Sequence, residues 1–190
     1  DEIYRSGISR KVGGSVSGGT DNGNYYISAG FDDQQGIVPT SSFKSGDMRI
    51  NFNQDLNDKL ILEARMSGYI SSTNFAESGD LLGGSNQSFI KQTISFRPII
   101  TDEFDTYEDL DISNPFSWVN DFEDISKESR YIGNLALTYK LPVQGLRYQV
   151  KIGGNIRTKE RRRFFGTTTW QGNNANGSLQ ITGLNNSSFQ

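Results

Sequence analysis

The acidic residues between Thr101 and Asp111, in the run TDEFDTYEDLD, are the first candidates for chemistry in this sequence. Carboxylate oxygens are the hard ligands that Ca²⁺ prefers, so the run can be interpreted as a calcium-binding loop. It lacks the ligand spacing and the central glycine of an EF-hand loop. We therefore expect a solvated acidic loop and no cofactor, with loop calcium as the alternative.

Two groups of charged residues suggest other chemistry. Arg binds phosphates and carboxylates in bidentate fashion, so Glu160–Arg163 can grip phosphate groups or a partner's acidic surface, or form only a charged rim. Paired carboxylates would suit a hydrolase such as a glycosidase, but no spacing marks a specific pair. The chain has no His and no Cys, which removes the commonest general base, thiolate zinc sites and disulfides. We expect no catalytic residues and no enzyme.

Aromatic residues in polar surroundings are the candidates for binding. They lie in segments that we expect to be long loops, where a ring can stack on a sugar, bind a peptide, or pack loops against each other or against a lid protein. Both interpretations stay open at this point. The residues are Trp118, Phe164, Phe165 and Trp170.

Composition limits the kind of fold that can position these residues. Only 34% of the 190 residues are hydrophobic, a poor supply for one thick core, whereas 21 glycines and 12% aromatics suit a sheet with one apolar and one wet face. The net charge of −3 argues against a nucleic-acid binder. No stretch approaches the roughly 20 apolar residues of a transmembrane helix.

Alternation of apolar and polar residues predicts about six antiparallel strands, at 8–20, 25–32, 47–56, 60–71, 131–140 and 146–156. Asp47–Leu56 is the clearest example. Asn22-Gly23 predicts a tight turn with positive φ angles between the first two strands. We expect long loops over 72–127 and 157–190, and a short helix or extended run over 87–100.

The strands and loops together favour a wall of a large transmembrane β-barrel. The last four strands are about 10–12 residues long, close to what a tilted strand needs to cross a bilayer, and short connections alternate with long ones. Charged residues on the inner face would be costly in a dry core but not in a water-filled lumen. We expect six polar residues to line that lumen rather than to be catalytic: Arg49, Asn51, Asn53, Asp55, Glu63 and Arg65.

Several segments closely resemble SusC/RagA-type TonB-dependent outer-membrane transporters of Bacteroidetes. They are GGTDNGNYYISAGFDDQQGIVP (Gly18–Pro39), the strand at Arg49–Asn51, Asn114-Pro115, and RYIGNLALTYKLPVQGLRYQVKIGGN (Arg130–Asn155). The resemblance implies a bacterial outer-membrane barrel of about 22 strands around a plug. It also implies oligosaccharide or peptide import with a SusD-like surface lipoprotein, and energy supplied through TonB.

On this interpretation residues 1–190 form part of the barrel domain. We expect the remaining strands, the plug and the amino-terminal region that contacts TonB to lie outside this sequence. Membrane lipid and lipopolysaccharide would surround the wall, and no nucleic acid is involved. The turns would be periplasmic and the long loops extracellular.

The alternative is a soluble extracellular β-sandwich that binds carbohydrate through its loop tryptophans. A barrel requires one set of apolar residues to face outward, whereas a sandwich requires the same set to be buried against a second sheet. The residues that separate the two interpretations are Met48, Ile50, Phe52, Leu135, Leu137, Val150 and Ile152.

Overall fold

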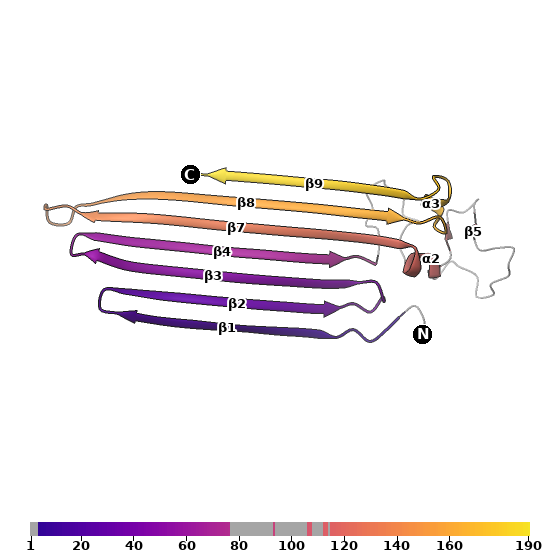
Figure 1. The fold of residues 1–190 in the computed structure, drawn as a ribbon, viewed down its shortest axis with the longest axis horizontal. Coiled ribbons are helices and arrows are strands. Elements are labelled where there is room, and N and C mark those ends of the chain that lie inside the picture. The colour runs from indigo at the N-terminus through magenta and orange to yellow at the C-terminus, as the bar shows by residue number, and fades with distance from the viewer. Residues whose placement is uncertain (1–3, 77–92, 94–105, 108–111, 114) are drawn as a thin grey trace.

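The computed structural model describes residues 4–76, 93, 106–107, 112–113 and 115–190. Most of them form one antiparallel sheet of seven strands, ordered β1-β2-β3-β4-β7-β8-β9 (Figure 1). The strands are β1 (Ser9–Thr20), β2 (Gly23–Gln35), β3 (Ser42–Asn57), β4 (Leu60–Asn74), β7 (Phe122–Lys140), β8 (Arg147–Phe165) and β9 (Ser178–Phe189). The all-β prediction is confirmed.

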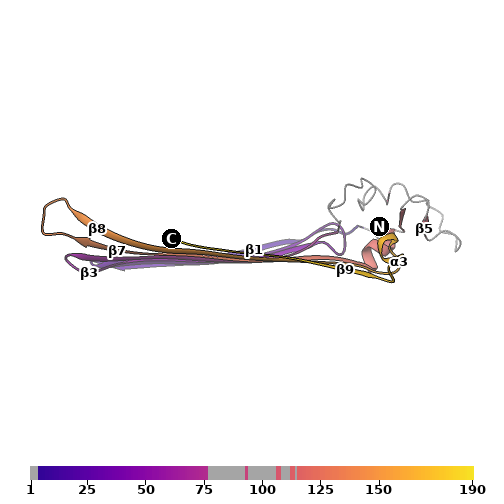
Figure 2. The same cartoon turned by 90° about the horizontal axis from the view of Figure 1, so that it is seen from above.

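The remaining elements are short and lie at the end of the sheet where the long connections run (Figure 1). They are the two-stranded ribbon β5 (Thr106–Tyr107) and β6 (Ile112–Ser113), and the helices α2 (Pro115–Asn120) and α3 (Trp170–Asn173). Within the described ranges, no helix is long and apolar enough to cross a membrane. Seen from above in Figure 2, the seven strands make a single layer.

The sheet has one strand more than we predicted, because residues 178–189 form β9 rather than part of a loop. Both β7 and β8 are 19 residues long and extend well beyond the predicted segments. The added length of β8 is the edge on which β9 pairs, from Phe165 opposite Ser178 to Gly154 opposite Phe189. Backbone pairing therefore creates β9 although it has no clear apolar face.

Short and long connections separate to opposite ends of the sheet. The β1–β2, β3–β4 and β7–β8 turns lie at one end, and residues 36–41, 75–121 and 166–177 connect strands at the other (Figure 1). We call these the turn end and the loop end. The acidic run at 101–111 lies outside the described residues except for the backbone of β5, as do Asn114 and most of 87–100.

The first turn differs from the sequence-based expectation in its geometry. Among described non-glycine residues only Asn176 has a positive φ, and the described glycines with positive φ are Gly145 and Gly177, so Asn22 and Gly23 do not. A Cβ on Gly23 would lie 2.7 Å from the Asn53 carbonyl oxygen. Close approach of β3, rather than a left-handed backbone, therefore requires glycine here.

Candidate functional site

The sheet has a polar face, whose members are identified by the strand register. Arg49, Asn51, Asn53 and Asp55 alternate along β3, and on β4 Arg65 lies opposite Asn51 and Glu63 opposite Asn53. The six residues predicted to line a lumen are thus brought together on one side of the sheet. The Asn53 side-chain amide also donates a hydrogen bond to Asn24 Oδ1 at 3.1 Å. Whether this face borders a lumen stays a prediction.

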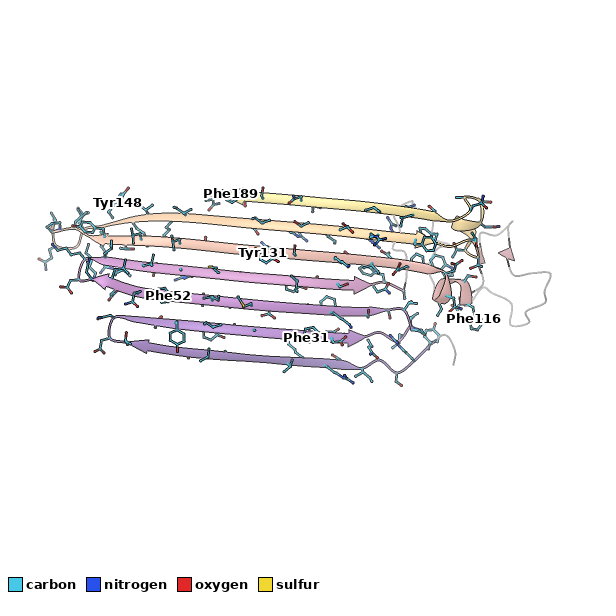
Figure 3. All side chains as sticks on the ribbon, in the orientation of Figure 1. Phe31, Phe52, Phe116, Tyr131, Tyr148 and Phe189 are labelled. Carbon is cyan, nitrogen blue, oxygen red and sulfur yellow. The ribbon has the colours of Figure 1, made fainter. Side chains whose placement is uncertain are left out.

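The opposite face carries a continuous apolar band. Its residues pair across every interface from β1 to β8: Val12, Val16, Tyr25, Ile27, Phe31, Met48, Ile50, Phe52, Leu62, Met66, Ile70, Tyr131, Leu135, Leu137, Tyr139, Tyr148, Val150, Ile152 and Ile156. Figure 3 labels four of these on four different strands: Phe31, Phe52, Tyr131 and Tyr148.

The band is open to its surroundings. Leu135 exposes 47% and Ile152 63% of its surface, and Ile50 is half-buried among its neighbours. No second sheet covers the band in the part of the chain that the structure describes. The arrangement matches the outward orientation that the barrel requires and contradicts the burial that a sandwich requires.

The dimensions and borders of the band fit a hydrocarbon layer. From Tyr131 to Tyr139 it spans eight residue steps of β7, about 26 Å along the strand. Transmembrane barrels carry an apolar band about 25 Å tall between aromatic girdles. Tyr139 pairs with Tyr148 at the turn end, and Phe31 and Tyr131 lie toward the loop end.

Charge is distributed unevenly over the polar face. Beyond its two acids, Asp124 and Glu128, the polar face of β7 and β8 is basic: Arg130, Lys140, Arg147, Lys151, Arg157, Lys159, Arg161 and Arg163. Over β1–β4 the same face mixes the two signs: Lys11, Asp32, Asp47, Arg49, Asp55, Glu63 and Arg65. The polar face of β7 and β8 therefore carries most of the positive charge.

Glu128 lies beyond the band at the loop end and shows the effect of this charge. Arg157 donates two hydrogen bonds to its carboxylate, at 2.8 and 3.2 Å. The hydrogen bond from Arg157 lowers the pKa of Glu128 from its ordinary value of 4.5, opposed by partial burial and helped by the charges of Arg157, Lys159 and Arg130. The carboxylate is thus held ionised among basic side chains.

Asp124 and Arg161 form a more deeply buried pair closer to the loops. Asp124 is fully buried, and both of its carboxylate oxygens accept hydrogen bonds from the Arg161 guanidinium, which lies 5.0 Å from the Phe75 ring centroid. The hydrogen bond to Asp124 raises the pKa of Arg161. Burial, followed by the charge of Arg161, lowers the pKa of Arg163. The pair fixes the start of β7 to the end of β8.

The four residues Glu160–Arg163 are not gathered into one anion-binding cluster, which was one of the two alternatives beside a charged rim. These residues lie in β8, where consecutive side chains point to opposite faces. Arg161 and Arg163 belong to the polar face, and Glu160 and Arg162 to the other. The expectation treated the four as neighbours in a loop, and strand alternation separates them.

Three aromatic rings form the only cluster of fully buried apolar residues within the described chain. Trp118 of α2 lies 4.7 Å from Phe122, and Phe122 lies 5.2 Å from Phe165, measured between ring centroids. Val38, from the loop between β2 and β3, completes the cluster. It joins the loop ends of β7 and β8 to α2 and to the loop between β2 and β3, and we call it the rim cluster.

The structure shows where the candidate loop aromatics lie, for those whose side chains are described. Trp118 exposes 1% and Phe165 4% of its surface, so these rings pack the rim and offer no free face in this structure. Phe164, at the end of β8 rather than in a loop, is exposed on the other face. Trp170 lies in α3, and its side chain is outside the described part. Contact with substrate stays a prediction for this set.

Sequence reasoning missed Phe122 and Val38, the other half of the rim cluster. Phe122 falls in a stretch that we assigned to a loop. The next residues on its face, Asp124 and Ser126, are polar, so the stretch lacks the apolar–polar alternation that indicates a strand. For metals, no group of three or more His, Cys, Asp or Glu side chains among the described residues is arranged to hold an ion.

The chain has relatives in sequence and a counterpart among solved structures. No family model matches the chain. It is 26% identical over 179 residues to TonB-dependent receptor P3 of Formosa agariphila, which covers 90% of this chain and 18% of that protein. It is also 26% identical over 175 residues to TonB-dependent receptor SusC of Bacteroides thetaiotaomicron, covering 81% and 17%.

The fold has a counterpart among solved structures. A structure of the RagAB peptide transporter superposes with a TM-score of 0.67 at 17% sequence identity, and covers 99% of this chain and 22% of that one. The chain thus spans about a fifth of the length of the proteins it matches. The resemblance to SusC/RagA-type transporters seen in the sequence is confirmed.

Proposed function

We propose that this chain, a segment of the β-barrel of a SusC/RagA-type TonB-dependent transporter, forms part of the wall of an outer-membrane nutrient importer. The importer moves oligosaccharides or peptides across the outer membrane together with a SusD-like surface lipoprotein. The relatives are TonB-dependent receptors, and the structural neighbour is a peptide transporter. These names support the class of function and leave the solute open.

The two-faced sheet is the observation that carries the proposal. An exposed apolar band on one side and a charged face on the other suit a wall between lipid and water. Within the described sheet, β1 and β9 each have one edge without a partner strand. Backbone groups cannot stay unpaired in lipid, so further strands must pair with both edges and close the barrel.

The proposed mechanism involves no bond chemistry in this chain. The solute is captured between the loops and the lipoprotein, and force transmitted by TonB then displaces the plug. The solute moves along the polar face, where charged and amide side chains replace part of its hydration. The loop end is extracellular, and its rim cluster and Asp124–Arg161 pair keep the loop bases fixed during capture.

Lipid exposure tests the orientation of the wall in the full-length transporter. Fluorescent labels on single cysteines at Leu137 and Ile152 should be strongly quenched by brominated lipids, because both side chains face outward. Labels at Glu63 and Lys151, on the opposite face, serve as matched controls and should respond to a water-soluble quencher. Equal quenching at all four positions, or the reverse pattern, would exclude the proposed wall.

Transport requires a separate assay. A strain that lacks the gene should lose uptake of one class within a panel of radiolabelled oligosaccharides and oligopeptides, and the intact gene should restore it. Co-purification of a surface lipoprotein with the transporter tests the proposed partner. A strain that takes up the whole panel normally would contradict the importer.

A further inference from the structure

The apolar band contains a groove near its loop-end border. The groove is open to its surroundings, has a volume of about 620 Å³ and crosses β3, β4, β7 and β8, with Gly46, Gly68, Gly133 and Gly154 among its lining residues. Its volume is within the roughly 300–1,000 Å³ of small-molecule sites. A Cβ on Gly133 would meet nothing within 4 Å, so the floor is open there, whereas the Tyr131 ring lies over Gly68.

The groove continues toward the loop end, where its lining residues become polar. A second hollow of about 580 Å³ shares Gly46 and Ile70 with the first, and its lining adds Ser72, two lysines (Lys44 and Lys127) and two acids (Glu128 and Glu160). The two hollows therefore form one continuous path from an apolar trough to a polar end, where Lys44 and Lys127 lie on the two sides of Ser72. In Figure 3, the labels Phe31 and Tyr131 mark β2 and β7, two of the strands that line this path.

The two lysines flank one serine. Lys44 and Lys127 both pair with Ser72 of β4, from the strands on its two sides, so their backbones are about 10 Å apart. Both side chains are exposed, and neither forms an ion pair in the described part of the protein. The nearest acids, Asp33 and Glu160, lie on the outer sides of the pair, opposite Lys44 and Lys127. No carboxylate stands between the two ammonium groups.

We propose that this groove binds a phosphorylated, acylated lipid of the outer leaflet. An acyl chain lies in the glycine-floored trough, and a phosphate sits over Ser72 between Lys44 and Lys127. The inference rests on the proposed function, which places this face against lipid and the loop end outside. Charge complementarity selects the occupant, because an anion on an apolar tail fits both ends of the path and a neutral lipid fits only one.

The site differs from the one that the sequence suggested for phosphate. Of the arginines in the run Glu160–Arg163, only Arg162 shares the face of the groove, and it does not line either hollow. Lys44 and Lys127 are distant in sequence and become neighbours of Ser72 only through the register of three strands. A sequence pattern of clustered basic residues therefore misses the pair.

Two pairs of variants of the full-length transporter test the two ends of the groove. Lys44→Ala with Lys127→Ala removes the phosphate contacts, and Lys11→Ala with Lys151→Ala removes two lysines from the opposite face as a control. Gly133→Val fills the trough floor. Gly183→Val is its matched control, because its Cβ also meets nothing within 4 Å and it lines neither hollow.

Binding is measured on delipidated protein in detergent by native mass spectrometry. The probes are lipid A with both phosphates, the same lipid with its phosphates removed, and inorganic phosphate alone. We expect the double lysine variant to bind phosphorylated lipid A about 30-fold more weakly, with binding of the dephosphorylated lipid unchanged. Gly133→Val should weaken the binding of both lipids, and both control variants should bind them as the wild type does.

Three results would overturn the inference. Equal binding of the two lipids by the wild type would show a trough without a phosphate end. Binding of inorganic phosphate as tight as that of lipid A would show an anion site unrelated to lipid. Equal effects of Lys44/Lys127 and Lys11/Lys151 replacement would show general electrostatic attraction. Since binding is measured in detergent, these results are independent of the lipid-quenching test of the wall.

Discussion

A lysine placed at the centre of the apolar band should destabilise the barrel far more than a lysine placed three residues away on the same strand. Ile152 lies midway between Tyr148 and Ile156 on β8, opposite Leu135, and faces outward. Gln149 lies on the polar face next to Lys151, which is already a lysine. The two changes, Ile152→Lys and Gln149→Lys, differ only in which face receives the charge.

The expected magnitude follows from depth in the band. Half of the band is about 13 Å, longer than a lysine side chain, so the ammonium group at position 152 cannot reach water at either border. A lysine at the bilayer midplane of a barrel costs about 2–4 kcal/mol, which corresponds to about 100-fold in the folding equilibrium. Gln149→Lys loses one hydrogen bond to Thr138 at 2.9 Å and should cost about 1 kcal/mol or less.

Equilibrium urea unfolding of the full-length transporter in lipid bilayers measures the difference as a shift in midpoint at constant slope. The Gln149→Lys variant should have an unfolding midpoint close to that of the wild type. The Ile152→Lys variant should unfold at a clearly lower urea concentration. Equal shifts for the two variants would refute the assignment of faces. So would an Ile152→Lys shift smaller than about 0.5 kcal/mol, because then the band does not face hydrocarbon.

Three further predictions concern the loop end. Trp118→Ala empties the centre of the rim cluster, and a loss of about 3–5 kcal/mol of local stability should appear as faster hydrogen exchange at α2 and the start of β7; unchanged exchange would contradict the packing. Arg161→Ala leaves the fully buried Asp124 without its partner and should cost about 3 kcal/mol on unfolding, whereas Arg157→Ala breaks a more exposed pair and should have less effect; the opposite ranking would reject the burial argument. Because the pKa of Glu128 is lowered in the folded state, its ion pair stabilises the protein above pH 4.5 and loses this effect as pH falls through the folded pKa; Glu128→Gln should remove that part of the acid destabilisation, and an unchanged pH profile of unfolding would argue against the pair.

The face assignment could be predicted from sequence because it depends only on local alternation. On β3 the apolar residues Met48, Ile50 and Phe52 alternate with Arg49, Asn51 and Asn53, and strand geometry turns this period of two directly into two faces. Lipid on one side and water on the other keep the pattern clear. The predicted segments therefore coincide with the part of each strand that crosses the band.

Beyond the band the same signal disappears, which explains the missed strand and the assignment of Arg161–Arg163 to a loop. Where both faces of a strand meet water, nothing selects apolar residues, and Thr182, Asn185 and Ser187 of β9 resemble a loop. The extension of β8 through Arg161–Arg163 was lost for the same reason. These strands are identified only by their pairing with distant segments of the chain. That pairing cannot be read from a single sequence.

The rim cluster was hidden by a different cause. Val38, Trp118 and Phe165 are far apart in the chain and come from the β2–β3 loop, from α2 and from the end of β8. Their types indicate only that a large apolar surface must be covered somewhere near the loops. The position at which each loop returns to the sheet decides which ring is buried. In the structure Trp118 and Phe165 are buried and Phe164 is exposed.

The register adds a property that the alternation alone cannot give, the inclination of the strands to the membrane. The turn-end border of the band passes through Tyr25 on β2 and Tyr148 on β8, and pairing across the sheet offsets these two by four residues. The loop-end border passes through Phe31 on β2 and Ile156 on β8, and these two are offset by two residues. Offsets of about 7–13 Å over about 19 Å of sheet width incline the strands by about 20–35°. The upper value meets the roughly 35–45° of membrane barrels, and both borders shift in the same direction, as a flat membrane crossing a tilted sheet requires.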